Sequence, residues 1–113
     1  GKKKLQLLAD LADQGMLQQL IGQLNKDMKL SGIDHEFKVE TSPEGLVQSL
    51  QQLIFTLMTR DFRNYLNFLY RVDVSEAKIK NIPETDATRI SEKMTILILQ
   101  REWQKVWFRN KIQ

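Results

Sequence analysis

The feature that most restricts the fold of this chain is the spacing of its hydrophobic residues, which recur every three or four positions over long stretches. Such spacing places them on one side of an α-helix, whereas a half-buried strand alternates apolar and polar residues. Residues 3–29 and 43–70 contain the longest stripes, so the sequence predicts an all-α fold. The first stripe consists of Leu5, Leu8, Ala12, Met16, Leu20, Leu24 and Met28.

Several residues mark where the predicted helices begin and end. Gly15 follows two polar residues, and the first stripe is either one helix or two helices divided near this glycine. Gly32 predicts a helix end, because glycine readily adopts the left-handed conformation found there. Ser42 and Pro43 are typical of a helix start. From there the apolar stripe extends to about residue 70, as one bent helix or as two abutting helices divided near Asp61. The spacing favours near-continuity over residues 43–70.

Residues 33–41 depart from the helical spacing. Phe37 and Val39 alternate with charged residues, which is a short strand-like pattern. The chain contains no obvious partner for a single strand. We therefore predict an extended arm that lies across the helices.

The last third of the chain predicts a short helix and then a long one. Ser75 is suited to cap the short helix. Thr85 and Asp86 begin the long helix, which reaches about Asn110. Its centre, residues 94–99, is apolar on nearly all sides, and such a helix is usually surrounded by others. The predicted fold is therefore an irregular bundle of four to five helices.

Length and composition limit the organisation and the chemistry. A chain of 113 residues has room for one hydrophobic core, so we expect a single helical domain over residues 1–113. Cysteine is absent, which excludes disulfides, zinc–thiolate sites and thiol nucleophiles, and it fits a cytoplasmic protein. No run approaches the roughly 20 apolar residues that cross a bilayer, so we expect no membrane span.

Candidate catalytic and metal-binding residues are scarce. His35 is the only histidine, and it lies between Asp34 and Glu36. Adjacent side chains point in different directions and rarely bind one metal ion together. The sequence also lacks a phosphate-binding glycine loop and a nucleophile elbow. We therefore expect a surface histidine, no catalytic residue, no metal and no cofactor, and a protein that is not an enzyme.

The end of the last predicted helix interleaves aromatic and basic residues. Arg101, Lys105 and Arg109 are spaced by four and form one ridge, which could contact successive phosphates while tryptophan stacks on bases. Alternatively, the tryptophans complete the core and the cations interact with the helix dipole. A third interpretation is a protein-binding face. The candidate contact residues are Arg101, Trp103, Lys105, Trp107, Phe108, Arg109 and Lys111.

Two segments of the chain, Leu66–Glu76 and Ile98–Lys105, resemble segments of small uncharacterised bacterial helical proteins. In these proteins a turn of the type LYRVDVSE precedes a final helix with a signature of the type REWQKVWFR. The resemblance implies a bacterial origin and a compact helical fold. It implies no activity and no site residues.

Together these patterns favour a non-enzymatic module for protein interaction or regulation, which binds another protein or a second copy of itself. The alternative is a nucleic-acid-binding protein that uses the basic aromatic residues of the last helix. The two differ in their response to salt, because phosphate contacts weaken steeply with ionic strength and apolar contacts do not.

Overall fold

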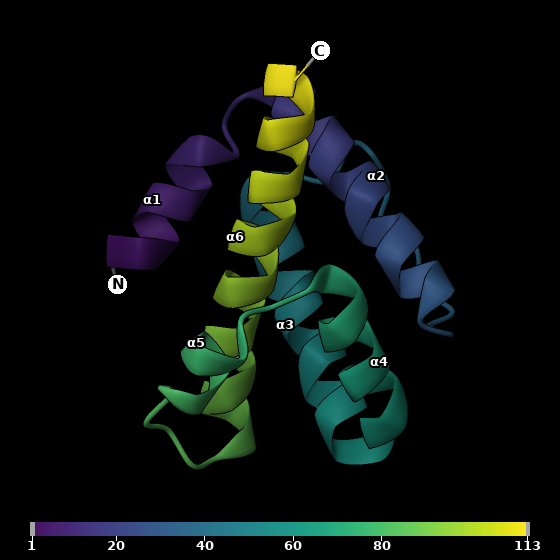
Figure 1. The fold of residues 1–113 in the computed structure, drawn as a ribbon, viewed down its shortest axis with the longest axis vertical. Helices are drawn as coiled ribbons and strands as arrows, with labels where there is room; N and C mark the ends of the chain where they lie inside the picture. The colour runs from purple at the N-terminus through teal and green to yellow at the C-terminus, as the bar shows by residue number, and fades with distance from the viewer. Residues whose placement is uncertain (1, 113) are drawn as a thin grey trace.

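The computed structural model describes residues 2–112, and this part of the chain folds into α-helices without a strand (Figure 1). The all-α fold expected from the apolar spacing is therefore confirmed. The described residues form six helices rather than four or five, because residues 43–72 divide into two. The helices are α1 (Lys2–Asp10), α2 (Gln14–Leu30), α3 (Pro43–Arg60), α4 (Phe62–Val72), α5 (Glu76–Lys80) and α6 (Ala87–Ile112).

The first apolar segment forms two helices, one of the two arrangements that the sequence left open. The break lies at residues 11–13, just before Gly15, which belongs to the first turn of α2. The side chain of Asp13 accepts a hydrogen bond from the Met16 N–H at 3.2 Å and so caps α2. Leu11, within the break, is fully buried and joins the two helices to one core.

Of the two arrangements that the sequence left open for residues 43–70, the structure contains two helices, and the near-continuity that the spacing favoured is wrong. Asp61 ends α3, where its N–H donates to the Leu57 carbonyl at 2.9 Å. The same residue begins α4, where its carboxylate accepts from the Asn64 N–H. An aspartate side chain that bonds to nearby backbone competes with helix continuation. The chain therefore reverses, and α3 and α4 pack side by side (Figure 1).

The segment predicted as an arm lies between α2 and α3 and contains neither helix nor strand, and its residues 39 and 40 form a turn. Its residues 33–38 have no regular secondary structure, and Ile33 and Phe37 are buried. The side chain of Asn25 takes the place of a partner strand, because its amide group donates to the Phe37 carbonyl and accepts from the Phe37 N–H, both at 2.9 Å. His35 is exposed, as expected.

Helix α6 lies at the centre of the bundle and packs against α1, α2, α3 and α4 (Figure 1). The carboxylate of Asp86 caps it by accepting from the Arg89 N–H at 2.9 Å. Met94, Ile98 and Val106 are fully buried on its inner face. The prediction of a long, central last helix is confirmed. Within residues 2–112, no helix combines the length and apolar character that a bilayer span requires.

Candidate interaction surface on the last helix

The seven candidate residues lie on the second half of α6, but the structure divides them into two groups. The basic ridge of Arg101, Lys105 and Arg109 turns toward other parts of the same chain. The Nε atom of Arg101 donates to the Asp73 carbonyl at 3.1 Å, and its Nη2 lies 3.3 Å from the Asp73 carboxylate. Asp73 ends α4 in the left-handed conformation (φ 68°), so Arg101 holds the end of that helix.

Lys105 is the most enclosed cation of the ridge. Its Nζ atom lies 2.9 Å from the Asp27 carboxylate of α2, 2.9 Å from the Glu102 carboxyl group and 3.3 Å from the Arg71 carbonyl. The last cation, Arg109, donates to the Gln23 side chain of α2 at 2.9 Å. Each member of the ridge therefore binds an acceptor within the chain.

Glu102 and Asp27 form a buried acidic pair beside Lys105, which the sequence interpretation missed. Glu102 is 0% exposed and Asp27 is 3% exposed. Neither carboxyl oxygen of Glu102 has a hydrogen bond of good geometry, although Lys105 is close. Burial raises the pKa of Glu102 to about 8, the contact with Asp27 adds to this, and Lys105 opposes it. Glu102 therefore keeps its proton at neutral pH.

The sequence did contain a signal for this pair. Glu102 lies four residues after Ile98 and four before Val106, so it falls on the buried stripe of α6. Asp27 likewise lies beside Leu24 and Met28 on the buried stripe of α2. A carboxyl group on an apolar stripe predicts a buried, perturbed acid.

The second group of candidate residues is aromatic, and two of its three members are exposed. Trp103 is half-buried against the core, while Trp107 is 37% exposed and Phe108 is 54% exposed. The two tryptophan rings stack with centroids 6.3 Å apart, and Phe108 meets Trp107 edge-on at 5.2 Å. Ile112 is 84% exposed. We call Trp103, Trp107, Phe108 and Ile112 the aromatic end.

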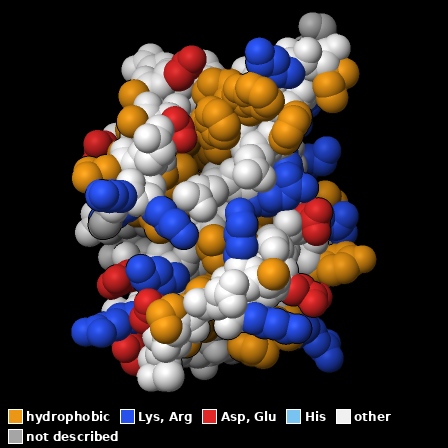
Figure 2. Space-filling view, turned by 60° about the vertical axis from the view of Figure 1, so that its left-hand side comes forward, with side chains coloured by type: hydrophobic (Ala, Val, Ile, Leu, Met, Phe, Trp, Pro, Cys, Tyr) orange, Lys and Arg blue, Asp and Glu red, His pale blue; other side chains and the backbone are white. Residues whose placement is uncertain are grey.

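Positive charge accompanies the aromatic end. The Lys111 Nζ atom lies 5.2 Å from the centre of the Trp107 ring, within cation–π range. Residues 103–112 contain no acidic residue. Figure 2 shows hydrophobic side chains gathered on the surface near the top of the molecule, close to where α6 ends. The surface thus combines exposed apolar area with cations.

A second exposed apolar surface lies on α4. Phe62 is 55%, Leu66 is 48% and Tyr70 is 87% exposed, and their spacing by four aligns them along one side of the helix. Phe62 and Leu66 continue the apolar spacing of residues 43–70, which predicts that they face the core, but the structure leaves both exposed. The inner side of α4 is formed instead by Tyr65, Phe68, Leu69 and Val72.

Comparison with known proteins finds no family model, no curated protein and no solved structure that matches this chain. Within residues 2–112, no group of three or more histidine, aspartate or glutamate side chains is arranged to hold a metal ion. Inferences about function therefore depend on the surfaces described above.

Proposed function

We propose that this chain is a non-enzymatic protein-interaction module of the cytoplasm whose contact surface is the aromatic end of α6. The observation that carries the proposal is the exposure of Trp107, Phe108 and Ile112 over the last two turns of a helix that is otherwise packed in the core. Tryptophan and phenylalanine are enriched at the centres of protein interfaces, where they contribute much of the binding energy.

The chemistry of the surface favours an acidic, amphipathic partner. The Lys111 amino group lies 5.2 Å from the centre of the exposed Trp107 ring, and among the described residues no carboxylate lies within 4.0 Å of it. A partner with apolar side chains and carboxylates would bury the rings and neutralise this cation. Complementary charge of this kind raises association rates and specificity.

No observation favours nucleic acid as the partner. The three cations spaced by four, Arg101, Lys105 and Arg109, already bind acceptors in the same chain. Contact with successive phosphates would require these bonds to break. We also propose that the chain is not an enzyme. The buried acidic pair of Asp27 and Glu102 could act as an acid or base only if a substrate reached it, and both side chains are closed to solvent.

The test compares two matched double variants in affinity capture from a cell extract, with captured proteins quantified by mass spectrometry. Trp107→Ser with Phe108→Ser removes the exposed rings of the aromatic end. Phe62→Ser with Tyr70→Ser removes similar exposed aromatic area from α4. We expect a specific set of proteins to be lost with the first variant and retained with the second.

The proposal is wrong if both double variants capture the same proteins as the wild type. Sedimentation at increasing protein concentration distinguishes a second copy of this chain from a different partner. Retention on DNA or RNA that disappears between low and physiological salt, and that survives the loss of Trp107 and Phe108, would instead support the nucleic-acid alternative.

A further inference from the structure

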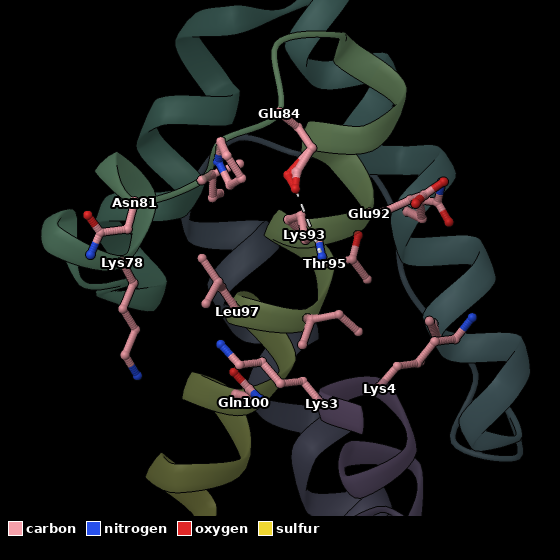
Figure 3. A pocket seen from close by; sticks show the side chains of 15 residues that line it. Lys3, Lys4, Lys78, Asn81, Glu84, Glu92, Lys93, Thr95, Leu97 and Gln100 are labelled. Carbon is pink, nitrogen blue, oxygen red and sulfur yellow. Dashed lines mark ion pairs between the residues drawn. The ribbon is translucent and has the colours of Figure 1, made fainter. Parts of the chain in front are cut away.

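A groove with a cavity of about 640 Å³ runs beside the first half of α6, away from the aromatic end (Figure 3). It is enclosed by α1, α3, α6 and the segment from α5 to residue 84. Its volume falls within the roughly 300–1,000 Å³ that small-molecule sites occupy. A smaller hollow of about 270 Å³ adjoins it, and the two share Lys78, Leu97 and Gln100.

The lining of the groove is partly apolar and partly polar, and we call its apolar side chains the apolar floor. Val47 of α3, Ile82 of the segment after α5, and Ile96 and Leu97 of α6 line it. Ile96 and Leu97 belong to the part of α6 that is apolar on nearly all sides, yet both remain partly exposed. The cover on this side is incomplete, because α5 has only five residues and none of them is buried.

Two charged side chains at one end of the groove form an ion pair, whereas the lysines at the other end have no carboxylate partner within the described part of the chain. Lys93 lies 4.0 Å from Glu84 at one end, and this pair neutralises itself. At the other end Lys3 of α1 and Lys78 of α5 approach the cavity beside Gln100, as Figure 3 shows. Among residues 2–112, no carboxylate lies within 4.0 Å of either lysine amino group. One end of the groove therefore carries positive charge that no carboxylate of the described residues neutralises.

We propose that this groove binds a small amphiphile with one negative charge, a carboxylate attached to a hydrocarbon chain. The carboxylate lies between the amino groups of Lys3 and Lys78 and accepts a hydrogen bond from the Gln100 amide. The hydrocarbon chain lies along Leu97 and Ile96. This combination of an apolar floor with a few convergent polar groups is typical of small-molecule sites.

The same residues argue against a polyanion such as a nucleotide. The groove has no aromatic side chain on which a base could stack, and its far end contains the carboxylates of Glu84 and Glu92. A ligand with several negative charges would meet these carboxylates. A single charge at the lysine end avoids them.

The test uses sodium decanoate below its micelle concentration as the probe, added to the ¹⁵N-labelled protein and followed by NMR. We expect saturable shifts in the backbone amides around Leu97 and Gln100. Decylammonium has the same chain with the opposite charge, and acetate has the same head group without the chain. Both should bind at least about tenfold more weakly, since each lacks one of the two contributions.

Two double variants distinguish binding in the groove from a general effect of the protein's net charge. Lys3→Glu with Lys78→Glu reverses the charge at the groove, whereas Lys2→Glu with Lys80→Glu makes the same change on the same helices outside the lining. We expect the first to weaken decanoate binding about tenfold or more and the second to leave it within about twofold. Circular dichroism checks that both variants fold.

Three outcomes would overturn the proposal. The first is the absence of saturable shifts with decanoate. The second is equal binding of decanoate and decylammonium, which can be measured on the wild type alone. The third is a set of shifts centred on Trp107 and Phe108, which would indicate adsorption to the aromatic end.

Discussion

The two parts of the second half of α6 have similar composition and opposite environments. Residues 101–106 contain two cations, an acid and a tryptophan, and they contact α2 and the end of α4 through specific polar bonds. Residues 107–112 contain two cations and two aromatic residues, but three of their large apolar side chains are exposed. The neighbouring helices therefore decide which contacts a basic aromatic segment makes. Its amino-acid pattern alone does not.

Removal of one cation from each part should have very different effects on the free energy of unfolding. Lys105→Met leaves the Asp27 carboxylate buried without its cation, and removing one partner of a buried ion pair costs about 3–5 kcal/mol of unfolding free energy. Lys111→Met removes an exposed cation and should change stability by less than about 0.5 kcal/mol. Urea denaturation of both variants at pH 7 measures the difference. Equal, small losses would show that Asp27 has access to water.

The second prediction concerns pH and follows from the raised pKa of Glu102. Between pH 5 and pH 8 the unfolded chain has lost this proton while the native protein keeps it, so stability falls as the pH rises. With a pKa of about 8 in the native state, the step from pH 6 to pH 8 should remove roughly 2 kcal/mol. Above about pH 8 the loss levels off.

Glu102→Gln is the matched control for this pH dependence. The amide has nearly the same shape and cannot lose a proton, so the variant should lack the fall between pH 6 and pH 8. Denaturant titrations at several pH values measure both proteins. A wild type whose stability is constant over this interval, or a variant with the same slope, would contradict the assignment of the slope to Glu102.

The third prediction compares one apolar residue from residues 101–106 with one from residues 107–112; we call the point between these two parts the boundary. Val106 is fully buried, and Val106→Ala should cost about 1–2 kcal/mol through lost burial and a small cavity. Phe108 is 54% exposed, and Phe108→Ala should cost less than about 1 kcal/mol although it removes a larger side chain. Thermal and urea unfolding measure both. A larger loss for Phe108 would place the aromatic end inside the core.

The sequence was sufficient for most of the fold because local signals specified it. Apolar spacing predicted the helices, and the predicted caps at Ser42, Ser75 and Asp86 are all present. The reversal at Asp61 was missed, because an aspartate inside an apolar stripe is compatible with one helix or two. The side of α4 that faces the core depends on that reversal. The apolar spacing therefore could not reveal that Phe62 is exposed.

The candidate site was less predictable, for a related reason. Spacing by four correctly places Arg101, Lys105 and Arg109 on one side of α6, but it does not reveal which helix lies alongside. Their acceptors are 28 residues or more away in sequence, at Asp73, Asp27 and Gln23. Of the residues around the ridge, Glu102 and Asp27, which each fall on a buried stripe, could have been identified from the chain alone.

The last prediction has the smallest effect on stability and tests the boundary directly by fluorescence. Trp103→Phe leaves Trp107 as the only tryptophan, and Trp107→Phe leaves Trp103. Trp103 is half-buried with its indole nitrogen enclosed, so its emission should lie at shorter wavelength and resist quenching by acrylamide. Trp107 is 37% exposed and should emit at longer wavelength and be quenched readily. Equal quenching of the two would mean that Trp107 is no more exposed than Trp103. The proposal that the aromatic end is a contact surface would then be contradicted, because it depends on the exposure of Trp107.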